Sequence, residues 1–301
     1  MVSFISELYA LTAAFLWACS ASLLEKLAHR LSPRELNIYK GSVALVFLMG
    51  TSLLLGENFA GLTPMAMLFL LSSGVIGIGL GDTAYYAGLK DIGSRRALLL
   101  FALAPPMTAL IGWLFLGEVL SIISWLGIFI TVAGVTWVVT ERTPAEEITH
   151  DPKRMARGIL MGTLASLGQA VGLVLSRFVM NDPGISSLQS AALRLLAGVI
   201  FTFLWVTFGH QKIGIWRRET DWKKTFGLLV LVAFISTYLC LWLQQLSVKG
   251  IPAGIAQTLL STSPIFILPI SAIRGEKVSW RAILGALVSI FGVMLVFGLI
   301  G

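Results

Sequence analysis

An acidic residue and two tyrosines share one face of an apolar segment in the first half of the sequence. Asp82 lies inside this apolar run, and Tyr85 and Tyr86 follow at i+3 and i+4, positions that lie on the same side of an α-helix. An ionised carboxylate in such a setting costs several kcal/mol unless it is paired, hydrated or protonated. We therefore expect Asp82 to face a cavity, with the tyrosines as aromatic walls. Proton exchange at Asp82 is one hypothesis, and structural pairing with a nearby Lys or Arg is the other.

Two basic residues also fall inside apolar runs. Arg194 lies about ten residues into its run, whereas Lys40 lies only a few residues inside its own. A shift of 154 positions aligns Lys40 with Arg194 and Phe47 with Phe201. This matched placement favours a shared architectural use, such as bonding to exposed backbone carbonyls. The alternative is that the forked guanidinium of Arg194 binds the carboxylate of a substrate.

Other polar and aromatic residues recur at helical spacing inside apolar runs. Tyr238, Trp242 and Gln245 stand at i, i+4 and i+7, with Gln244 beside them. Aromatic rings with a few amides suit a cavity for a mostly neutral or zwitterionic solute, although any of these side chains could instead link helices. The complete set predicted to line one cavity is Trp17, Ser20, Asp82, Tyr85, Tyr86, Gln169, Arg194, Tyr238, Trp242, Gln245, Gln257 and Ser261.

Several motifs do not fit soluble enzyme chemistry. Gly74, Gly77, Gly79 and Gly81 lack the G-x-G-x-x-G spacing of a nucleotide loop, so we interpret them as sites of close helix packing, with local unwinding as the alternative. The three histidines fall in predicted loops, and Cys19 and Cys240 lie in separate apolar runs. The sequence therefore predicts no catalytic residue, metal site or cofactor.

The elements that must position these residues are membrane-spanning helices. Of the 301 residues, 56% are hydrophobic and 12% are charged, whereas a soluble domain carries roughly 25% charged residues. Because a bilayer core needs roughly 20 apolar residues per helix, we predict an all-α membrane protein of about ten transmembrane helices. Their expected spans are 5–27, 34–55, 64–89, 94–116, 119–140, 157–180, 184–209, 224–248, 251–273 and 279–300.

The two halves of the chain are related. A shift of 158 positions pairs Pro106 with Pro264, Gly117 with Gly275, Glu118 with Glu276, Ser121 with Ser279, Gly127 with Gly285, and Gly134 with Gly292. Two repeats are expected, over residues 1–141 and 157–301, joined by a linker over 142–156. Because each repeat has five helices, an odd number, the second enters the membrane inverted.

The repeated glutamates and the prolines have structural interpretations. Glu118 and Glu276 stand at the start of an expected helix, where the positive end of the helix dipole stabilises a carboxylate. Pro105, Pro106, Pro264 and Pro269 interrupt expected helices and can bend them.

The basic residues predict the orientation of the chain. The net charge is +7, but the basic residues cluster in short loops rather than along one face, so no nucleic-acid partner is expected. The odd-numbered loops hold 18 Lys and Arg and the even-numbered loops hold 2. The positive-inside rule then places the odd-numbered loops in the cytoplasm and both termini on the extracytoplasmic side.

The duplicated stretch from Pro106 to Gly134, repeated from Pro264 to Gly292, resembles the EamA-type domain of the drug/metabolite transporter superfamily. The resemblance implies a secondary transporter in the plasma (inner) membrane, most simply an exporter of a small polar or amphipathic metabolite such as an amino acid. Its partners would be that small molecule, the lipid bilayer and, if Asp82 couples transport, protons; the chain would act as a monomer or homodimer. An intramembrane lipid-modifying enzyme and a non-transporting membrane protein are the alternatives.

Overall fold

The computed structural model describes residues 2–139, 151–209, 221–273 and 279–296, and all regular secondary structure within these ranges is helical. Within the same ranges, nine helical segments are long and apolar enough to cross a membrane, and a shorter apolar helix follows them. The all-α membrane fold is thus confirmed. The helices are α1 (Val2–Arg30), α2 (Pro33–Leu54), α3 (Pro64–Gly74), α4 (Thr83–Phe101), α5 (Ala104–Leu116), α6 (Ile122–Val139), α7 (Pro152–Met180), α8 (Ser187–Phe208), α9 (Trp222–Val232), α10 (Cys240–Gly250), α11 (Ala253–Leu260), α12 (Ser263–Ile273) and α13 (Trp280–Val296), with the short η1 (Phe59–Gly61) between α2 and α3.

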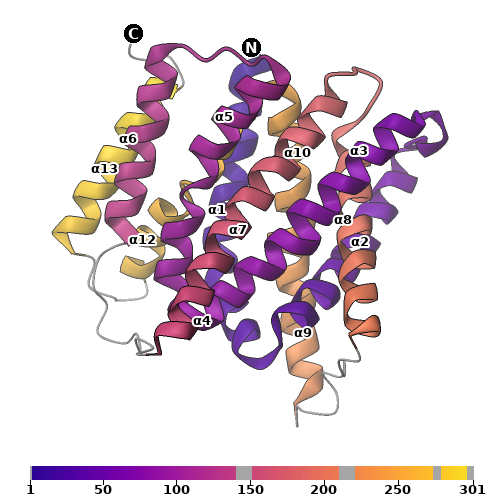
Figure 1. Ribbon diagram of the computed structural model, residues 1–301, viewed down its shortest axis with the longest axis horizontal. Helices are drawn as coiled ribbons and strands as arrows, with labels where there is room; N and C mark the ends of the chain where they lie inside the picture. Colours follow the sequence, from indigo (N-terminus) through magenta and orange to yellow (C-terminus); the bar gives the residue numbers. More distant parts are fainter. Residues whose placement is uncertain (1, 140–150, 210–220, 274–278, 297–301) are drawn as a thin grey trace.

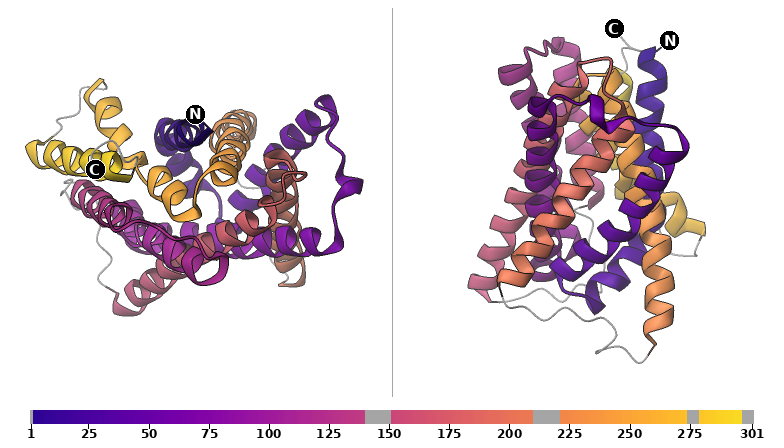
Figure 2. Two further views of the ribbon diagram at one scale, coloured as in Figure 1. Left: turned by 90° about the horizontal axis from the view of Figure 1, so that it is seen from above. Right: turned by 90° about the vertical axis from the view of Figure 1, so that its right-hand side faces the viewer.

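The bundle has two ends, which differ in charge. The start of α1 and the end of α13 lie at one end, here called the termini face (Figure 1; Figure 2, right). The described basic residues Arg30, Lys90, Arg154 and Arg157 lie near helix ends at the opposite side, here called the basic face. The structure therefore gathers at one face the positive charges that the sequence assigns to odd-numbered loops.

The two five-helix repeats pack as an inverted pair. α2 packs on α8, α5 on α11, and α6 on α13, so that equivalent segments of the two halves meet each other. Two further large contacts, α4 with α7 and α1 with α10, join the third segment of one repeat to the first segment of the other. This arrangement is what a two-fold axis relating inverted repeats produces.

The glycines that revealed the repeat form the closest of these contacts. α6 and α13 lie side by side at one edge of the bundle (Figure 2, left). A Cβ added to Gly127 would lie 2.8 Å from the carbonyl oxygen of Gly292, and one added to Gly134 would lie 2.6 Å from that of Gly285. Because Gly127 is equivalent to Gly285 and Gly134 to Gly292, the contact repeats itself across the axis. Small side chains thus let the two backbones approach.

Symmetry-related helices are also interrupted at matching positions. In the third segment of each repeat the helix widens into a π-helix, η2 (Val75–Asp82) and η4 (Ala233–Leu239), whose starts are 158 residues apart. In the fourth segment the helix breaks, between α4 and α5 and between α11 and α12. Pro105, Pro106 and Pro264 lie in the first turn after a break, at the starts of α5 and α12, and Pro269 lies inside α12.

Two glycines explain where the expected spans end. Gly93 has φ 81° inside the α4 range and separates the third span from the fourth, and Gly117 has φ 66° as the C-cap of α5. Both angles lie in the left-handed region that glycine adopts without steric cost. Since α6 begins only at Ile122, the expected span 119–140 starts about one turn too early.

We predict that Gly134→Ala lowers the stability of the bundle, because the new Cβ would lie 2.5 Å from the backbone nitrogen of Ser289. Overpacking of this kind costs ~1–3 kcal/mol. Gly227→Ala is the matched control, since nothing lies within 4 Å of a Cβ added there. Thermal unfolding of the purified variants in detergent measures the difference. Equal melting temperatures for the two variants would contradict the proposed contact.

Candidate functional site

A cavity of about 460 Å³ lies inside the bundle, between the two repeats. Its walls come from α1, α2, η2, α4 and α6 of the first repeat and from α7, α8, η4, α10, α11 and α12 of the second. Both π-helices and both helix breaks contribute residues, among them Ile78, Phe101, Thr237 and Ser261. The interruptions of regular helix are thus concentrated around one space, where freed backbone groups can be bonded by side chains or water.

Three charged side chains meet at this cavity. Lys40 comes from α2, Asp82 from the end of η2 and Arg194 from α8. Lys40 and Arg194 are 6% and 1% exposed, whereas Asp82 is partly accessible. Asp82 interacts electrostatically with both cations, but within the described residues it forms no ion pair closer than 4 Å. One carboxylate therefore interacts electrostatically with two cations and forms an ion pair with neither.

Lys40 does not reach toward the membrane surface, as its position near a helix end would allow. Its Nζ donates a hydrogen bond to the hydroxyl of Tyr86, and the ammonium lies over the Tyr86 ring, 5.2 Å from the centroid. The repeat symmetry that relates Lys40 to Arg194 thus brings both cations to the same cavity. The residue equivalent to Asp82 in the second repeat is Cys240, so the carboxylate has no symmetric counterpart.

Arg194 lacks the backbone bonds that an architectural role would require. Its Nε and Nη1 are buried and have no hydrogen-bond partner among the described residues. A Cβ on Gly77 would lie 3.4 Å from Nη2, and one on Gly74 would collide with the carbonyl of Arg194 itself. Glycines of α3 and η2 thus let α8 approach closely and leave room for the guanidinium. The close-packing interpretation of these glycines agrees with the structure, where the helix is widened rather than unwound.

Aromatic and amide groups complete the walls. The ring of Tyr85 lies against those of Tyr86 and Phe101, with centroids 5.7 and 5.2 Å apart. Trp17 donates from Nε1 to the carbonyl of Ser236 in η4, at 2.8 Å. Gln169 of α7 donates a hydrogen bond of 3.3 Å to Gln257 of α11. The cavity is therefore mainly apolar, with a few convergent polar groups, as is typical of small-molecule sites.

Nine of the twelve residues expected to form one cavity line this one: Trp17, Ser20, Asp82, Tyr85, Tyr86, Gln169, Arg194, Gln257 and Ser261. Whether they bind substrate remains a prediction.

Tyr238, Trp242 and Gln245 do not line the cavity, which differs from our expectation. They turn toward α2 and α8: Tyr238 shares a hydrogen bond with the hydroxyl of Thr51, and Gln245 accepts one from Ser190. The neighbouring face, with Thr237, Leu241 and Gln244, faces the cavity instead. Spacing showed which residues share a face, but the π-turns of η4 alter the helical phase, and packing decides which face points inward.

The cavity is closed toward the termini face. A cluster of buried apolar residues from α1, α3, α7, α10 and α11 fills that half of the bundle, with Leu70, Leu173 and Leu259 at 0% exposure. Toward the basic face the lining continues through Leu24, Leu89 and Ile270. The lining of the cavity therefore extends toward the basic face rather than toward the termini face.

Glu118 holds the two repeats together at the closed end. Its Oε1 accepts a hydrogen bond from Arg177 at 3.1 Å, and its Oε2 accepts one from the backbone nitrogen of Ala253, the first residue of α11. Arg177 also donates to the carbonyls of Val248 and Lys249. The expected role at a helix start is thus corrected: Glu118 stabilises the N-terminus of a helix in the other repeat. Glu276 lies outside the described residues.

A second ionic contact lies at the basic face. Asp91 at the end of the third segment accepts hydrogen bonds of 2.7 Å from Nε and Nη2 of Arg157 at the start of α7. Arg154 donates to the carbonyl of Lys90 and lies 3.4 Å from Asp91. Because this contact lies on the α4–α7 seam, it joins the repeats without crossing the cavity.

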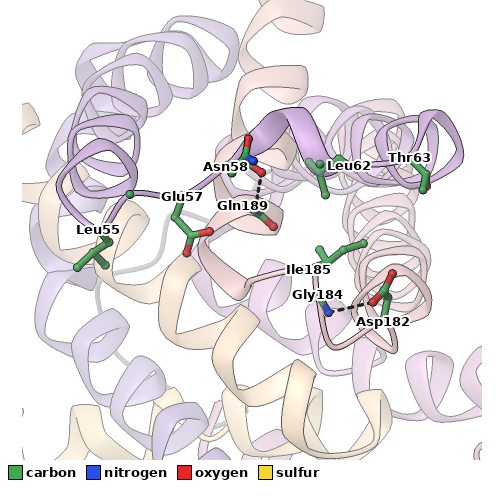
Figure 3. A pocket seen from close by; sticks show the side chains of 11 residues that line it. Leu55, Glu57, Asn58, Leu62, Thr63, Asp182, Gly184, Ile185 and Gln189 are labelled. Atoms are coloured by element: carbon green, nitrogen blue, oxygen red, sulfur yellow. Dashed lines mark hydrogen bonds between the residues drawn. The ribbon is translucent and has the colours of Figure 1, made fainter.

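A separate surface pocket of about 480 Å³ lies at the termini face (Figure 3). It is formed by the connections between α2 and α3 and between α7 and α8. Gln189 donates to the carbonyl of Asn58 at 3.0 Å, and Asp182 accepts from the backbone of Gly184. The first bond joins the two connections and the second stabilises the turn between α7 and α8, so Gln189 and Asp182 have structural roles in this pocket.

A model of the EamA-like transporter family matches residues 4–140 and again residues 156–298. The chain belongs to the EamA-like transporter family. This family is part of the drug/metabolite transporter superfamily, so the resemblance noted from the repeated motif is confirmed. With its apolar helices, this EamA-like protein is a multi-pass membrane protein and a membrane transporter.

Individual relatives agree with this assignment. The uncharacterised transporter YyaM of Bacillus subtilis (strain 168) is 25% identical over 233 residues, which span 75% of this chain and 72% of YyaM. A protein of known crystal structure shares the fold, with a TM-score of 0.79 at 16% identity, over 98% of this chain and 96% of that one.

We predict that the charges of the EamA-like cavity are energetically coupled. Asp82→Asn leaves two cations without a counter-charge and should lower stability, and Lys40→Gln in that background should recover part of the loss. Neighbouring charges give coupling energies of ~0.5–3 kcal/mol. The control cycle pairs Asp82→Asn with Lys153→Gln, at an exposed residue near the basic face. Thermal unfolding of the single and double variants gives the stability change for each cycle. The changes should be additive in the control cycle with Lys153. If they were also additive for Asp82 and Lys40, the two charges would not be coupled.

Proposed function

We propose that this protein is a secondary transporter that exports a small polar or amphipathic metabolite by alternating access around the central cavity. The observation that carries the proposal is a cavity bounded by symmetry-related interruptions of four helices, holding charges that the protein neutralises only in part. Inverted repeats provide two conformations, because exchanging the conformations of the two repeats exchanges the side that is open.

The conformation described here would be the one that loads substrate from the cytoplasm. The basic face carries the excess of Lys and Arg, which the positive-inside rule places in the cytoplasm, and the lining of the cavity extends toward that face. A solute would enter past Leu89 and Ile270 and meet the charged groups at mid-depth. Both termini would then lie on the extracytoplasmic side of the plasma membrane.

Release on the other side requires that the closed end separate. Contacts of Glu118 with Arg177 and with Ala253 join the end of the fourth segment of one repeat to the first and fourth segments of the other. In the outward-open state these bonds must break or be exchanged, since they cross the seam between the repeats. Weakening them should therefore shift the population toward the outward-open state.

We predict that Glu118→Gln makes the cavity more accessible from the termini face. The probe is Ser263→Cys, which lines the cavity, in a background where Cys19 and Cys240 are replaced by alanine. A membrane-impermeant maleimide should label it faster in inside-out than in right-side-out vesicles. Glu118→Gln should raise the right-side-out rate several-fold by removing the ion pair.

The control for this labelling is Glu57→Gln, because Glu57 lies on the same face in the surface pocket. It should leave both rates unchanged. If Ser263→Cys reacted faster in right-side-out vesicles without the Glu118 change, the proposed orientation would be wrong. If Glu118→Gln left the labelling rate of right-side-out vesicles unchanged, Glu118 would have no role in closing the termini face.

Coupling to a proton gradient would act through Asp82. Only a group whose charge differs between the two states can couple a gradient to transport, and Asp82 is the one carboxylate among the described residues that line the cavity. Its partial accessibility, without an ion pair, leaves it free to exchange a proton with the entering water.

We predict that Asp82→Asn abolishes proton-driven accumulation and preserves exchange. A screen of labelled amino acids and other metabolites in liposomes first identifies a transported solute. The variant should then lose concentrative uptake under a pH gradient, yet still exchange labelled for unlabelled solute at equal pH. A stable variant that concentrates solute at the original rate would exclude Asp82 as the coupling group. The absence of any transported solute would count against the transport proposal itself.

A further inference from the structure

We infer that the central cavity recognises a solute that carries a carboxylate next to an apolar, aromatic-sized body. This inference rests on the proposed function, because it names the class of solute that the transporter would carry. The first argument is charge: among the described residues that line the cavity, two side chains are cationic, Lys40 and Arg194, and one is anionic, Asp82. An anionic group on the solute would supply the missing charge.

The second argument is that the cavity holds buried hydrogen-bond donors with no partner. Nε and Nη1 of Arg194 and Nε2 of Gln244 are buried and unbonded among the described residues, and both side chains line the cavity. Arg194 is 1% exposed and Gln244 is 3% exposed. A buried donor without a partner carries an uncompensated desolvation cost, so these N–H groups favour a ligand that accepts hydrogen bonds.

The geometry of these donors fits a carboxylate. A guanidinium offers a planar fork of N–H groups that matches the two oxygens of a carboxylate, whereas an ammonium is a point charge. Lys40 is already engaged with the hydroxyl of Tyr86. Arg194 is therefore the group left to bind the anion directly, with Lys40 and Gln244 beside it.

The remaining wall selects the rest of the solute. Trp17, Tyr85 and Phe101 line the cavity together with several leucines and isoleucines. A space of about 460 Å³ lies within the range of small-molecule sites, ~300–1,000 Å³. The solute would thus place its carboxylate at Arg194 and an apolar or aromatic body against these rings.

Asp82 would oppose the same anion. It interacts electrostatically with both cations, so an ionised Asp82 competes with a bound carboxylate for them. Removing the charge of Asp82 should therefore strengthen anion binding. If Asp82 instead contacted the solute directly and favourably, removing its charge would weaken binding.

Three matched probes test the inference on the purified full-length protein: 3-phenylpropionate, its neutral amide 3-phenylpropionamide, and the cation 3-phenylpropylamine. Affinity is measured from intrinsic tryptophan fluorescence and, independently, from the shift in melting temperature. The carboxylate should bind at least ~10-fold more tightly than the amide, since a hydrogen bond to a charged group is stronger than one between neutral groups. The amine should bind least.

Variants assign the effect to the cavity. Arg194→Gln should remove the preference for the carboxylate, Arg194→Lys should restore only part of it, and Asp82→Asn should tighten carboxylate binding. Lys153→Gln removes an equal charge from the exposed basic face and should change nothing. If Arg194→Gln does not fold, Gln244→Leu and Arg194→Lys provide the same test with a smaller change.

The outcomes separate this inference from the proposed function. Equal or tighter binding of the amide or the amine, or no binding of any probe, overturns the carboxylate inference even if another solute is transported. Carboxylate binding that depends on Arg194, but without exchange of any bound carboxylate across liposomes, supports the site and contradicts the transport proposal.

Discussion

Placing two cations and one carboxylate inside an apolar bundle is the constraint on which the rest of this structure depends. A charge at mid-depth in a membrane is costly unless it faces water or a partner. Lys40, Asp82 and Arg194 come from three separate segments and meet at one cavity. The bundle must therefore keep a polar space open at its centre and still seal its lipid-facing surface.

The interruptions of the helices follow from that requirement. π-turns in η2 and η4 and breaks before α5 and α12 all border the cavity. Irregular backbone at membrane depth is tolerated where it lines a polar cavity. Around this centre, glycines on α6 and α13 and on α3 and η2 bring helices of the two repeats into backbone contact. Close packing at the periphery thus supports an imperfectly packed middle.

The repeats are symmetric in architecture and asymmetric in chemistry. Lys40 and Arg194 occupy equivalent positions, but Asp82 is matched by Cys240, and the large apolar cluster around Leu70 and Leu173 fills the half of the bundle at the termini face. A transporter built from inverted repeats needs equal folds, so that two conformations exchange, and unequal side chains, so that the two sides differ. Glu118 links the repeated architecture to a specific contact: it belongs to the repeated motif, and its carboxylate accepts a hydrogen bond from the first residue of a helix in the other repeat.

Much of this protein follows from local sequence. Hydropathy reflects the free energy of transferring each segment into lipid, so the spans and the charges at mid-depth could be predicted from the sequence. The inverted duplication could be predicted from the repeated residues and the odd number of helices in each repeat. The tertiary structure decided which helix faces turn inward. Thr237 and Gln244 face the cavity in place of Tyr238 and Gln245, and Lys40 bonds to Tyr86 rather than reaching the surface. Periodicity fixes only the relative angle of side chains on one helix. The rotation of each helix about its own axis is set by π-turns and by contacts with distant segments, which no local pattern encodes.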